Sequence, residues 1–303
     1  MRGYGDNMIR VVVWRCAAAL GLAVSLAAGL AQASPDAAQA LRAQRETFRV
    51  PLEHNVFARP LVLLSSETQQ GLRGDLYALM AFPFGEVSSA LQDPQQWCEV
   101  MILHVNTKYC YAASTPKGTV LNVNIGKKTP QKLSQATRVV LNFTDVAKRP
   151  DYFEVLLQAK DGPMGTSDYR IALEAVALSP TQTFLHLTYS YSANLTGRLA
   201  MQIYLTTLGR DKVGFTLAGE PVNGQPAWID GIRSVVERNT MRYYLAIDSF
   251  LASATLPSAE RFERSLQLWF EATEQYPRQL HELDWSAYRE MKRTEHVRQK
   301  TAQ

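Results

Sequence analysis

The sequence predicts an α+β fold in which an antiparallel β-sheet is covered by one long helix near the C-terminal end. Roughly a hundred residues show the alternation of apolar and polar side chains that is typical of strands joined by tight turns. Residues 229–252 then repeat apolar side chains at steps of three and four, the period of one helix face. The expected stripe contains Ile232, Val236, Asn239, Tyr243, Ile247 and Phe250, and the residues expected largely outside it are Arg233, Glu237, Arg238 and Asp248.

The N-terminal residues 1–33 have the features of a secretory signal peptide. Arg10 and Arg15 flank a basic start, residues 16–30 are apolar, and Ala31-Gln32-Ala33 is a small-residue cleavage site. The apolar run is shorter than the ~20 residues that span a bilayer. We therefore expect a mature chain that begins at Ser34, has no transmembrane segment and is secreted, in a bacterium into the periplasm. A retained N-terminal anchor is the alternative.

The charge balance gives little indication of a partner. Without residues 1–33 the chain keeps 29 basic and 27 acidic residues, a net charge of +2. Dense basic sequence occurs at residues 292–300, which also carry Glu295, and we expect this tail to be solvated and frayed. A nucleic-acid partner is not expected, because such proteins concentrate Lys and Arg on one face.

The mature chain keeps two cysteines, Cys98 and Cys110. An even pair in an oxidising compartment favours a disulfide. The alternative is two unpaired thiols, because the sequence does not show whether their Cα atoms approach closely enough.

The elements before the strands that form the meander are a lead-in, a hairpin and two short helices. Residues 34–60 form a lead-in, with a short helix at 34–49 and breaks at Pro51 and Pro60. Gln69-Gln70-Gly71 predicts the turn of a hairpin between strands at 61–68 and 72–80. Pro83 and Asp93 then mark the starts of helices at 83–91 and 93–101.

Six strands are expected to follow as a meander, because short turns cannot cross over a sheet. Their expected ranges are 104–112, 119–127, 137–145, 153–160, 169–179 and 183–192. Residues 197–208 fit a helix or a strand, and we favour a helix. A further strand is expected at 209–219, and helices are expected at 258–274 and 284–293 after the long helix.

This order of elements is that of the helix-grip fold, and residues 72–252 resemble the START/polyketide cyclase (SRPBCC) superfamily. The resemblance rests on element order and on the segment Gly231-Ile232-Arg233-Ser234-Val235-Val236-Glu237-Arg238-Asn239-Thr240-Met241-Arg242-Tyr243-Tyr244. It implies a curved antiparallel sheet wrapped around the long C-terminal helix, with a cavity for a hydrophobic ligand between them. Residues 61–255 would form this domain, and residues 256–303 would form a helical C-terminal extension that the pattern lacks.

The resemblance and the apolar stripe together indicate candidate ligand-binding residues. These are Tyr189, Tyr191, Ile232, Val236, Asn239 and Tyr243. The tyrosines could instead be plain core residues, and the Asn239 amide could meet either a ligand head group or a backbone group of the sheet. Arg238 and Arg242 could bind a phosphate or carboxylate, although solvated surface arginines are the favoured interpretation.

Metal, cofactor and catalytic motifs are missing from the sequence. The five histidines are scattered, and no dinucleotide fingerprint, phosphate-binding glycine loop or Gly-x-Ser-x-Gly motif is present. We therefore assign no metal, no cofactor and no catalytic residue.

Three functions are compatible with these features. The favoured one is a periplasmic carrier of a hydrophobic small molecule, such as a lipid. The second is a cyclase-like enzyme in which pocket tyrosines, His186 or Glu237 exchange protons. The third is an interaction protein whose helical tail docks on an unidentified partner through a patch around Trp269 and Phe270.

Overall fold

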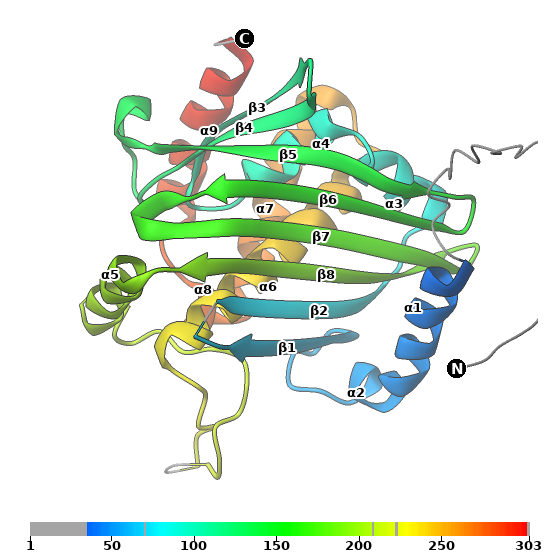
Figure 1. The fold of residues 1–303 in the computed structure, drawn as a ribbon, viewed down its shortest axis with the longest axis horizontal. Helices are drawn as coiled ribbons and strands as arrows, with labels where there is room; N and C mark the ends of the chain where they lie inside the picture. Colours follow the sequence, from blue (N-terminus) through cyan, green and yellow to red (C-terminus); the bar gives the residue numbers. More distant parts are fainter. Residues whose placement is uncertain (1–34, 70, 208, 222–223, 302–303) are drawn as a thin grey trace, which may run out of the picture. The chain divides into compact units, whose positions relative to one another are not determined.

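A single antiparallel sheet forms the centre of the fold (Figure 1). The structure, a computed structural model, describes residues 35–69, 71–207, 209–221 and 224–301, so the expected leader peptide lies outside the described residues. Within these residues, eight strands run in the order β1-β2-β8-β7-β6-β5-β4-β3. The strands are β1 (Leu61–Glu67), β2 (Leu72–Met80), β3 (Thr107–Thr115), β4 (Gly118–Ile125), β5 (Thr137–Lys148), β6 (Tyr152–Asp161), β7 (Thr166–Ser179) and β8 (Gln182–Ala193).

Helices cover both faces of the sheet (Figure 1). The helices are α1 (Pro35–Thr47), α2 (Arg49–Glu53), α3 (Phe84–Leu91), α4 (Pro94–Met101), α5 (Leu195–Thr206), α6 (Gly231–Ser253), α7 (Ser258–Glu274), α8 (Pro277–Leu280) and α9 (Trp285–Thr301). Helix α1 packs on the outer face through a small cluster that includes Leu41, Val176 and Phe184. The inner face holds α6, which confirms the predicted α+β helix-grip fold.

Helix α6 lies very close to strand β2. A Cβ atom at Gly74 would come within 2.3 Å of Thr240 Oγ1, so only glycine allows this separation of helix and strand. Thr240 is fully buried and donates its hydroxyl hydrogen to the backbone oxygen of Val236. The sheet therefore holds the helix by direct contact of backbone and side chain.

The expectation that α6 has a solvated polar face is wrong. Glu237, Arg238 and Arg242 are all buried, although Arg233 keeps partial exposure. The loop before α6 covers Glu237 and Arg238, which contact Thr216 and Val213. Helix α7 and the segment after it cover Arg242, which contacts Trp269 and Glu282. A helix covered on both sides has to bury the polar residues that the sequence pattern assigns to solvent.

The segment at 209–219 forms a loop with one isolated bridge, between Leu217 and Trp228, so the predicted strand is wrong. Its backbone N–H groups at Phe215 and Thr216 donate to Glu237 Oε2 at 2.5 and 3.1 Å instead of to a neighbouring strand. The helix predicted at 197–208 is confirmed as α5.

The expectation that residues 292–300 are solvated and frayed is also wrong, because they belong to the C-terminal helix α9. Lys292 and Glu295 are buried, and Glu295 accepts hydrogen bonds from Lys108 at 2.9 Å and from Lys292 at 2.6 Å. Lys292 also donates to the backbone oxygens of His104 and Thr107. The sequence pattern missed this because the side chains of this segment that are buried, Lys292, Glu295 and Gln299, are polar.

Helix α9 also covers the open edge of the sheet. Strand β3 is at the end of the strand order, so its outward backbone groups have no neighbouring strand. Gln299 Oε1 accepts a hydrogen bond from the N–H of Cys110 at 3.2 Å, and Arg298 donates to the oxygen of Lys108 at 3.3 Å. The tail therefore satisfies an edge that could otherwise pair with another chain.

The predicted disulfide between Cys98 and Cys110 is present and joins α4 to β3, with 5.2 Å between the Cα atoms. No helix in the described ranges is long and apolar enough to cross a membrane.

Replacing Glu295 by Gln should lower the free energy of unfolding by about 3 kcal/mol, because two buried lysines would lose their counter-charge. Urea unfolding of Glu295→Gln against wild type measures this change. The control is Glu290→Gln, at an exposed position of the same helix. Equal midpoints for all three proteins would show that the buried cluster contributes no stability.

Candidate functional site

A cavity of about 170 Å³ lies between α6 and the inner face of the sheet. Its aliphatic wall comes from α4 and from strands β4, β5 and β7. Its other wall is aromatic and polar and comes from the α4–β3 loop, β7, β8 and α6. The lining residues are Met101, His104, Asn106, Val123, Ile125, Val139, Leu141, Pro163, Tyr169, Ile171, Tyr189, Asn239 and Tyr243.

His104 and Tyr169 are the two titratable groups of this cavity that are not among the residues predicted from the sequence, and His104 has the more unusual environment. The His104 ring belongs to the α4–β3 loop. Its Nδ1 accepts a hydrogen bond from the N–H of Asn106 at 3.2 Å, which leaves the proton of the neutral ring on Nε2. Burial, followed by the positive charges of Arg242, Lys292 and Lys128, holds the pKa of His104 well below its usual value. The ring is therefore neutral at pH 7.

The environment of His104 Nε2 is unusual for a buried nitrogen. Nε2 makes no hydrogen bond of normal geometry within the described residues. The Asn239 side chain lies near the His104 ring and raises its pKa, but this is the smallest of the named influences on that pKa. The His104 ring packs at 5.0 Å from the ring of Tyr243. A ligand atom that accepts a hydrogen bond would satisfy Nε2.

Three tyrosines form the aromatic wall. The ring of Tyr189 lies 5.3 Å from that of Tyr243 and 6.2 Å from that of Tyr169. The Tyr169 hydroxyl bonds Thr166 Oγ1 at 2.9 Å, and Thr166 donates in turn to the oxygen of Pro163 at 2.5 Å. Burial raises the pKa of Tyr189 well above its usual value, and the nearby Tyr169 adds to the shift. These hydroxyls stay protonated at physiological pH, but the hydrogen of Tyr169 goes to Thr166, so Tyr169 cannot also donate to a ligand.

The structure brings half of the six candidate ligand-binding residues together around the cavity. Tyr189, Asn239 and Tyr243 line it. Tyr191, Ile232 and Val236 are buried in the same core but outside the lining. Tyr191 stacks on Tyr169 at 5.3 Å, which places it behind the aromatic wall. The role of all six candidate residues in ligand binding stays a prediction.

Asn239 has a partner that the sequence did not indicate. Its Oδ1 accepts a hydrogen bond from Arg242 Nη1 at 3.4 Å, rather than one from the backbone of the sheet. Arg242 is 2% exposed and also donates to Glu282 Oε1 at 2.5 Å. Its neighbour Arg238 is 1% exposed and donates to Ser234 and to the backbone oxygen of Val213. The interpretation of both arginines as solvated surface residues is therefore wrong.

His186 and Glu237 do not line the cavity. His186 points to the outer face of the sheet, where Nε2 lies 2.9 Å from Asp75 and Nδ1 lies 2.8 Å from Glu174. The ring of Tyr77 stacks on the imidazole at 4.1 Å. Burial alone would lower the pKa of His186, but the hydrogen bonds that Asp75 and Glu174 accept from the imidazole outweigh it and raise the pKa.

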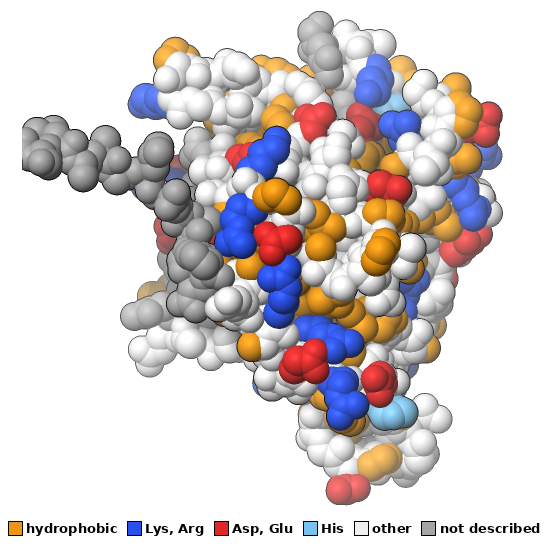
Figure 2. All heavy atoms as spheres, turned by 90° about the vertical axis from the view of Figure 1, so that its right-hand side faces the viewer, with side chains coloured by type: hydrophobic (Ala, Val, Ile, Leu, Met, Phe, Trp, Pro, Cys, Tyr) orange, Lys and Arg blue, Asp and Glu red, His pale blue; other side chains and the backbone are white. Residues whose placement is uncertain are grey.

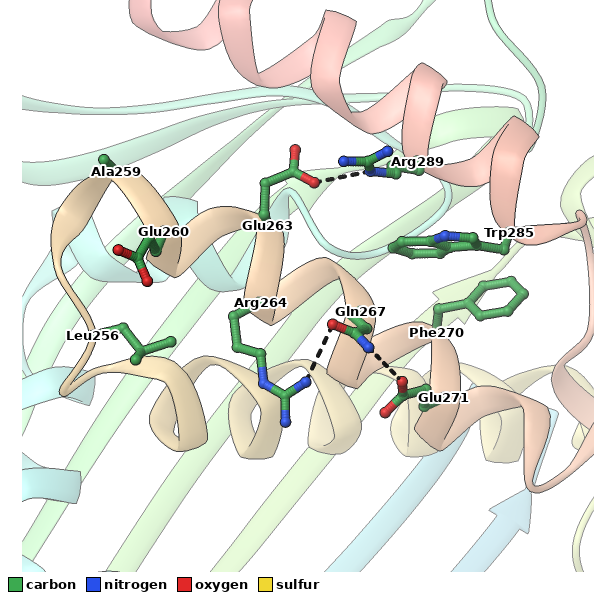
Figure 3. A pocket seen from close by; sticks show the side chains of 10 residues that line it. All are labelled: Leu256, Ala259, Glu260, Glu263, Arg264, Gln267, Phe270, Glu271, Trp285 and Arg289. Atoms are coloured by element: carbon green, nitrogen blue, oxygen red, sulfur yellow. Dashed lines mark hydrogen bonds and ion pairs between the residues drawn. The ribbon is translucent and has the colours of Figure 1, made fainter.

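The helical tail carries an open groove between α7 and α9, with a volume of about 760 Å³ (Figure 3). Phe270 and Trp285 lie at one end, and charged side chains such as Glu263 and Arg289 line the rest. Trp269, which was considered for a docking patch, is buried and stacks on Tyr288 at 5.0 Å, so this patch does not include it.

The molecular face in Figure 2 carries basic and acidic side chains interspersed with apolar ones, so basic residues form no uninterrupted surface among its described atoms. No group of three or more His, Cys, Asp or Glu side chains within the described ranges could hold a metal ion.

No model of a known protein family matches the chain, and no curated protein matches it. Several solved structures are similar to it. A START superfamily protein from Mycobacterium smegmatis is 14% identical with a TM-score of 0.32, and the match covers 45% of this chain and 89% of that protein. The Zhui aromatase/cyclase from Streptomyces sp. R1128 is 12% identical with a TM-score of 0.33, covering 67% and 93%.

Human StAR-related lipid transfer protein 5 is 9% identical with a TM-score of 0.31, and the match covers 58% of this chain and 90% of that protein. Likenesses at this level do not indicate a ligand or an activity.

Stability should fall as pH rises through the titration of His186. Its folded pKa is above the unfolded value of about 6.5, so the stabilisation is complete below that value and is lost as pH passes the folded pKa. The difference in free energy of unfolding between wild type and His186→Gln should therefore shrink as pH rises above about 6.5. His54→Gln, at an exposed histidine, serves as control. A pH-independent difference would contradict the prediction.

The strand order, the antiparallel pairing and the long helix held on the inner face together give this chain a helix-grip fold.

Proposed function

We propose that the protein is an exported, periplasmic carrier that binds a hydrophobic small molecule in the cavity beneath α6. The observation that carries this proposal is the cavity itself, with an aliphatic wall on the sheet and hydrogen-bonding groups at the opposite side. Ligand sites commonly combine apolar walls with a few polar groups that fix orientation. Binding of this kind requires no covalent chemistry.

The volume of the cavity limits what it can hold. At about 170 Å³ it is smaller than the roughly 300–1,000 Å³ of most ligand pockets and close to the ~150 Å³ of an apolar cavity that binds benzene. The closed cavity therefore suits one ring or a short alkyl chain. A longer lipid tail would have to leave it, and the partly exposed lining residues Asn106, Ile125 and Pro163 mark where the cavity approaches the surface.

Solvent extraction tests the proposal directly. The full chain is expressed in a bacterium, recovered from the periplasmic fraction and extracted with organic solvent for mass spectrometry. We expect one class of apolar molecule in stoichiometric amounts. Clean protein that also fails to bind any member of a panel of lipids and aromatic compounds would contradict a carrier function, and retention in the cytoplasm would contradict the location.

A larger side chain in the cavity should weaken ligand binding. Val139 lines the cavity and its neighbour Val140 is exposed on the other face of β5. Val139→Phe should weaken ligand binding by roughly tenfold or more, because the new ring occupies the space of the ligand. Val140→Phe is the matched control and should bind as wild type does. Isothermal titration with the extracted ligand measures both, and equal affinities would exclude this cavity as the site.

A second candidate function is favoured by one observation, the buried neutral imidazole of His104 in the cavity wall. A neutral ring with an unbonded Nε2–H can donate a hydrogen bond to negative charge that develops on a bound molecule, and the Tyr243 hydroxyl in the same wall can add a second one. The protein would then act as a cyclase-like enzyme on its hydrophobic ligand.

The enzyme function makes a separate prediction. If the His104 Nε2–H stabilises that charge, His104→Leu should lower conversion of the bound compound by about a hundredfold or more, while binding changes little. Mass spectrometry of the extracted ligand after incubation follows conversion, and titration follows binding. Equal loss of binding and conversion, or no conversion in wild type, would favour the carrier.

A further inference from the structure

We propose that Lys128, Arg238, Arg242 and Lys212 form a receptor for the anionic head group of the ligand whose apolar part occupies the cavity. This inference rests on the proposed binding function and names the chemical class of ligand, an amphiphile with a carboxylate or another oxyanion. We call these four residues the cation cluster.

The cation cluster is assembled from three parts of the chain. Lys128 comes from the β4–β5 loop, Arg238 and Arg242 come from successive turns of α6, and Lys212 comes from the loop before α6. Lys128 Nζ donates to Tyr204 Oη and to Glu282 Oε1, each at 2.6 Å, and Lys212 donates to the backbone oxygen of His281. Tertiary structure alone brings these side chains together.

The cluster has an excess of positive charge. Among the described residues, Glu282 is the carboxylate that contacts it, through Arg242 at 2.5 Å and Lys128 at 2.6 Å. Four cations and one carboxylate leave three positive charges without a direct counter-ion. Glu237 is the acidic residue on this part of α6, and its carboxylate contacts Ser65 and Thr216 rather than the cation cluster.

Burial makes this imbalance costly, because a charge removed from water needs a counter-charge. Arg238 and Arg242 are at most 2% exposed, and the side chain of Lys128 is 23% exposed. Burial, followed by repulsion from Arg242, lowers the pKa of Lys128 to about 8, and the same two causes lower the pKa of Arg238 to about 10. Arg242 also keeps a buried Nε with no hydrogen-bond partner in the described part of the chain. An added anion would relieve each of these features.

The cation cluster adjoins the polar side of the cavity. Arg242 donates to Asn239 Oδ1, and Asn239 lines the cavity next to His104. Arg242 and Lys128 are near enough to depress the pKa of His104, so their positive potential reaches the cavity wall. An oxyanion placed at Asn239 would meet this potential, while its apolar part would contact the aliphatic wall formed by residues such as Val139 and Leu141.

A purely structural cluster would differ in a measurable way. If the function of Lys128, Arg242 and Glu282 is to fasten the segment before α9, removing the Glu282 charge weakens the structure and does nothing for anions. If the cluster binds an anion, Glu282 competes with that anion. Neutralising Glu282 should then increase affinity for an anionic ligand.

The test compares hexanoate, 1-hexanol and acetate by isothermal titration on the full chain. Hexanoate has both the tail and the anion, hexanol has the tail, and acetate has the anion. We expect hexanoate to bind at least roughly tenfold more tightly than either of the others. It should exceed hexanol because hydrogen bonds to a charged group are stronger than those to a hydroxyl, and it should exceed acetate because acetate lacks the apolar tail.

Two variants then assign the difference to the cation cluster. Lys128→Met should remove most of the preference for hexanoate over hexanol, whereas Lys127→Met, at the exposed neighbouring position, should keep it. Glu282→Gln should strengthen hexanoate binding several-fold and leave hexanol unchanged, since it removes a competing carboxylate. Circular dichroism and thermal unfolding verify that each variant is folded, and Glu282→Gln tests the proposal even if Lys128→Met is not.

Each contrary outcome has a defined meaning. Equal affinity for hexanoate and hexanol overturns the head-group receptor and leaves the carrier function standing. Acetate binding as tightly as hexanoate overturns the connection between cluster and cavity. Unchanged hexanoate affinity in Glu282→Gln identifies the cluster as structural. Failure of both six-carbon probes, together with an empty solvent extract, overturns the carrier function as well.

Discussion

The burial of most of α6, its charged residues Glu237, Arg238 and Arg242 included, is the constraint on which the rest of the structure depends. The sheet covers one side of this helix, and α7 and the loop before α6 cover the other, so its polar side chains have to find partners inside the protein. Glu237 binds the backbone of the 215–216 loop, and Arg242 binds Glu282 in the segment that leads to α9. The helix thereby organises both the loop before it and the tail after it.

Two buried charge clusters illustrate what such partners can do. Around Glu295, Lys108 and Lys292 have one carboxylate and three backbone oxygens, of Val105, His104 and Thr107, so every ammonium group is well supplied with acceptors. Around Glu282, one carboxylate contacts two of the four cations, Lys128 and Arg242, and Arg242 Nε has no partner within the described ranges. The first arrangement fastens α9 to the sheet edge, whereas the second has unused capacity for a negative charge.

The cavity between these clusters combines small size with a sharp change of polarity. Its aliphatic wall belongs to the sheet, and its hydrogen-bonding wall belongs mainly to α6 and to the loop before β3. His104 stands at this boundary, and Lys292 donates to its backbone oxygen. The C-terminal helix is therefore part of the support of the cavity wall, and it belongs to the same compact unit as the sheet.

Local pattern determined most of the architecture. Alternation along the strands, turn residues, and the helix starts at Pro83 and Asp93 are properties of neighbouring residues, and the structure confirms the elements that rest on them. The spacing of Ile232, Val236 and Tyr243 likewise identified the face of α6 that enters the core. These features can be read from the sequence because φ/ψ preference and periodic burial act over a few residues.

Tertiary structure alone decided which polar residues are buried and what they contact. The pattern placed Arg238, Arg242 and the 292–300 tail in solvent, because it contains no information on the helices and loops that would cover them. The sequence pattern also gave no indication that His104 lines the cavity or that Lys128 contacts Glu282. Nor did it indicate that backbone N–H groups of residues 209–219 donate to the Glu237 carboxylate. Such contacts join residues far apart in the chain, and their free energy depends on burial, which exists only after the layers have packed.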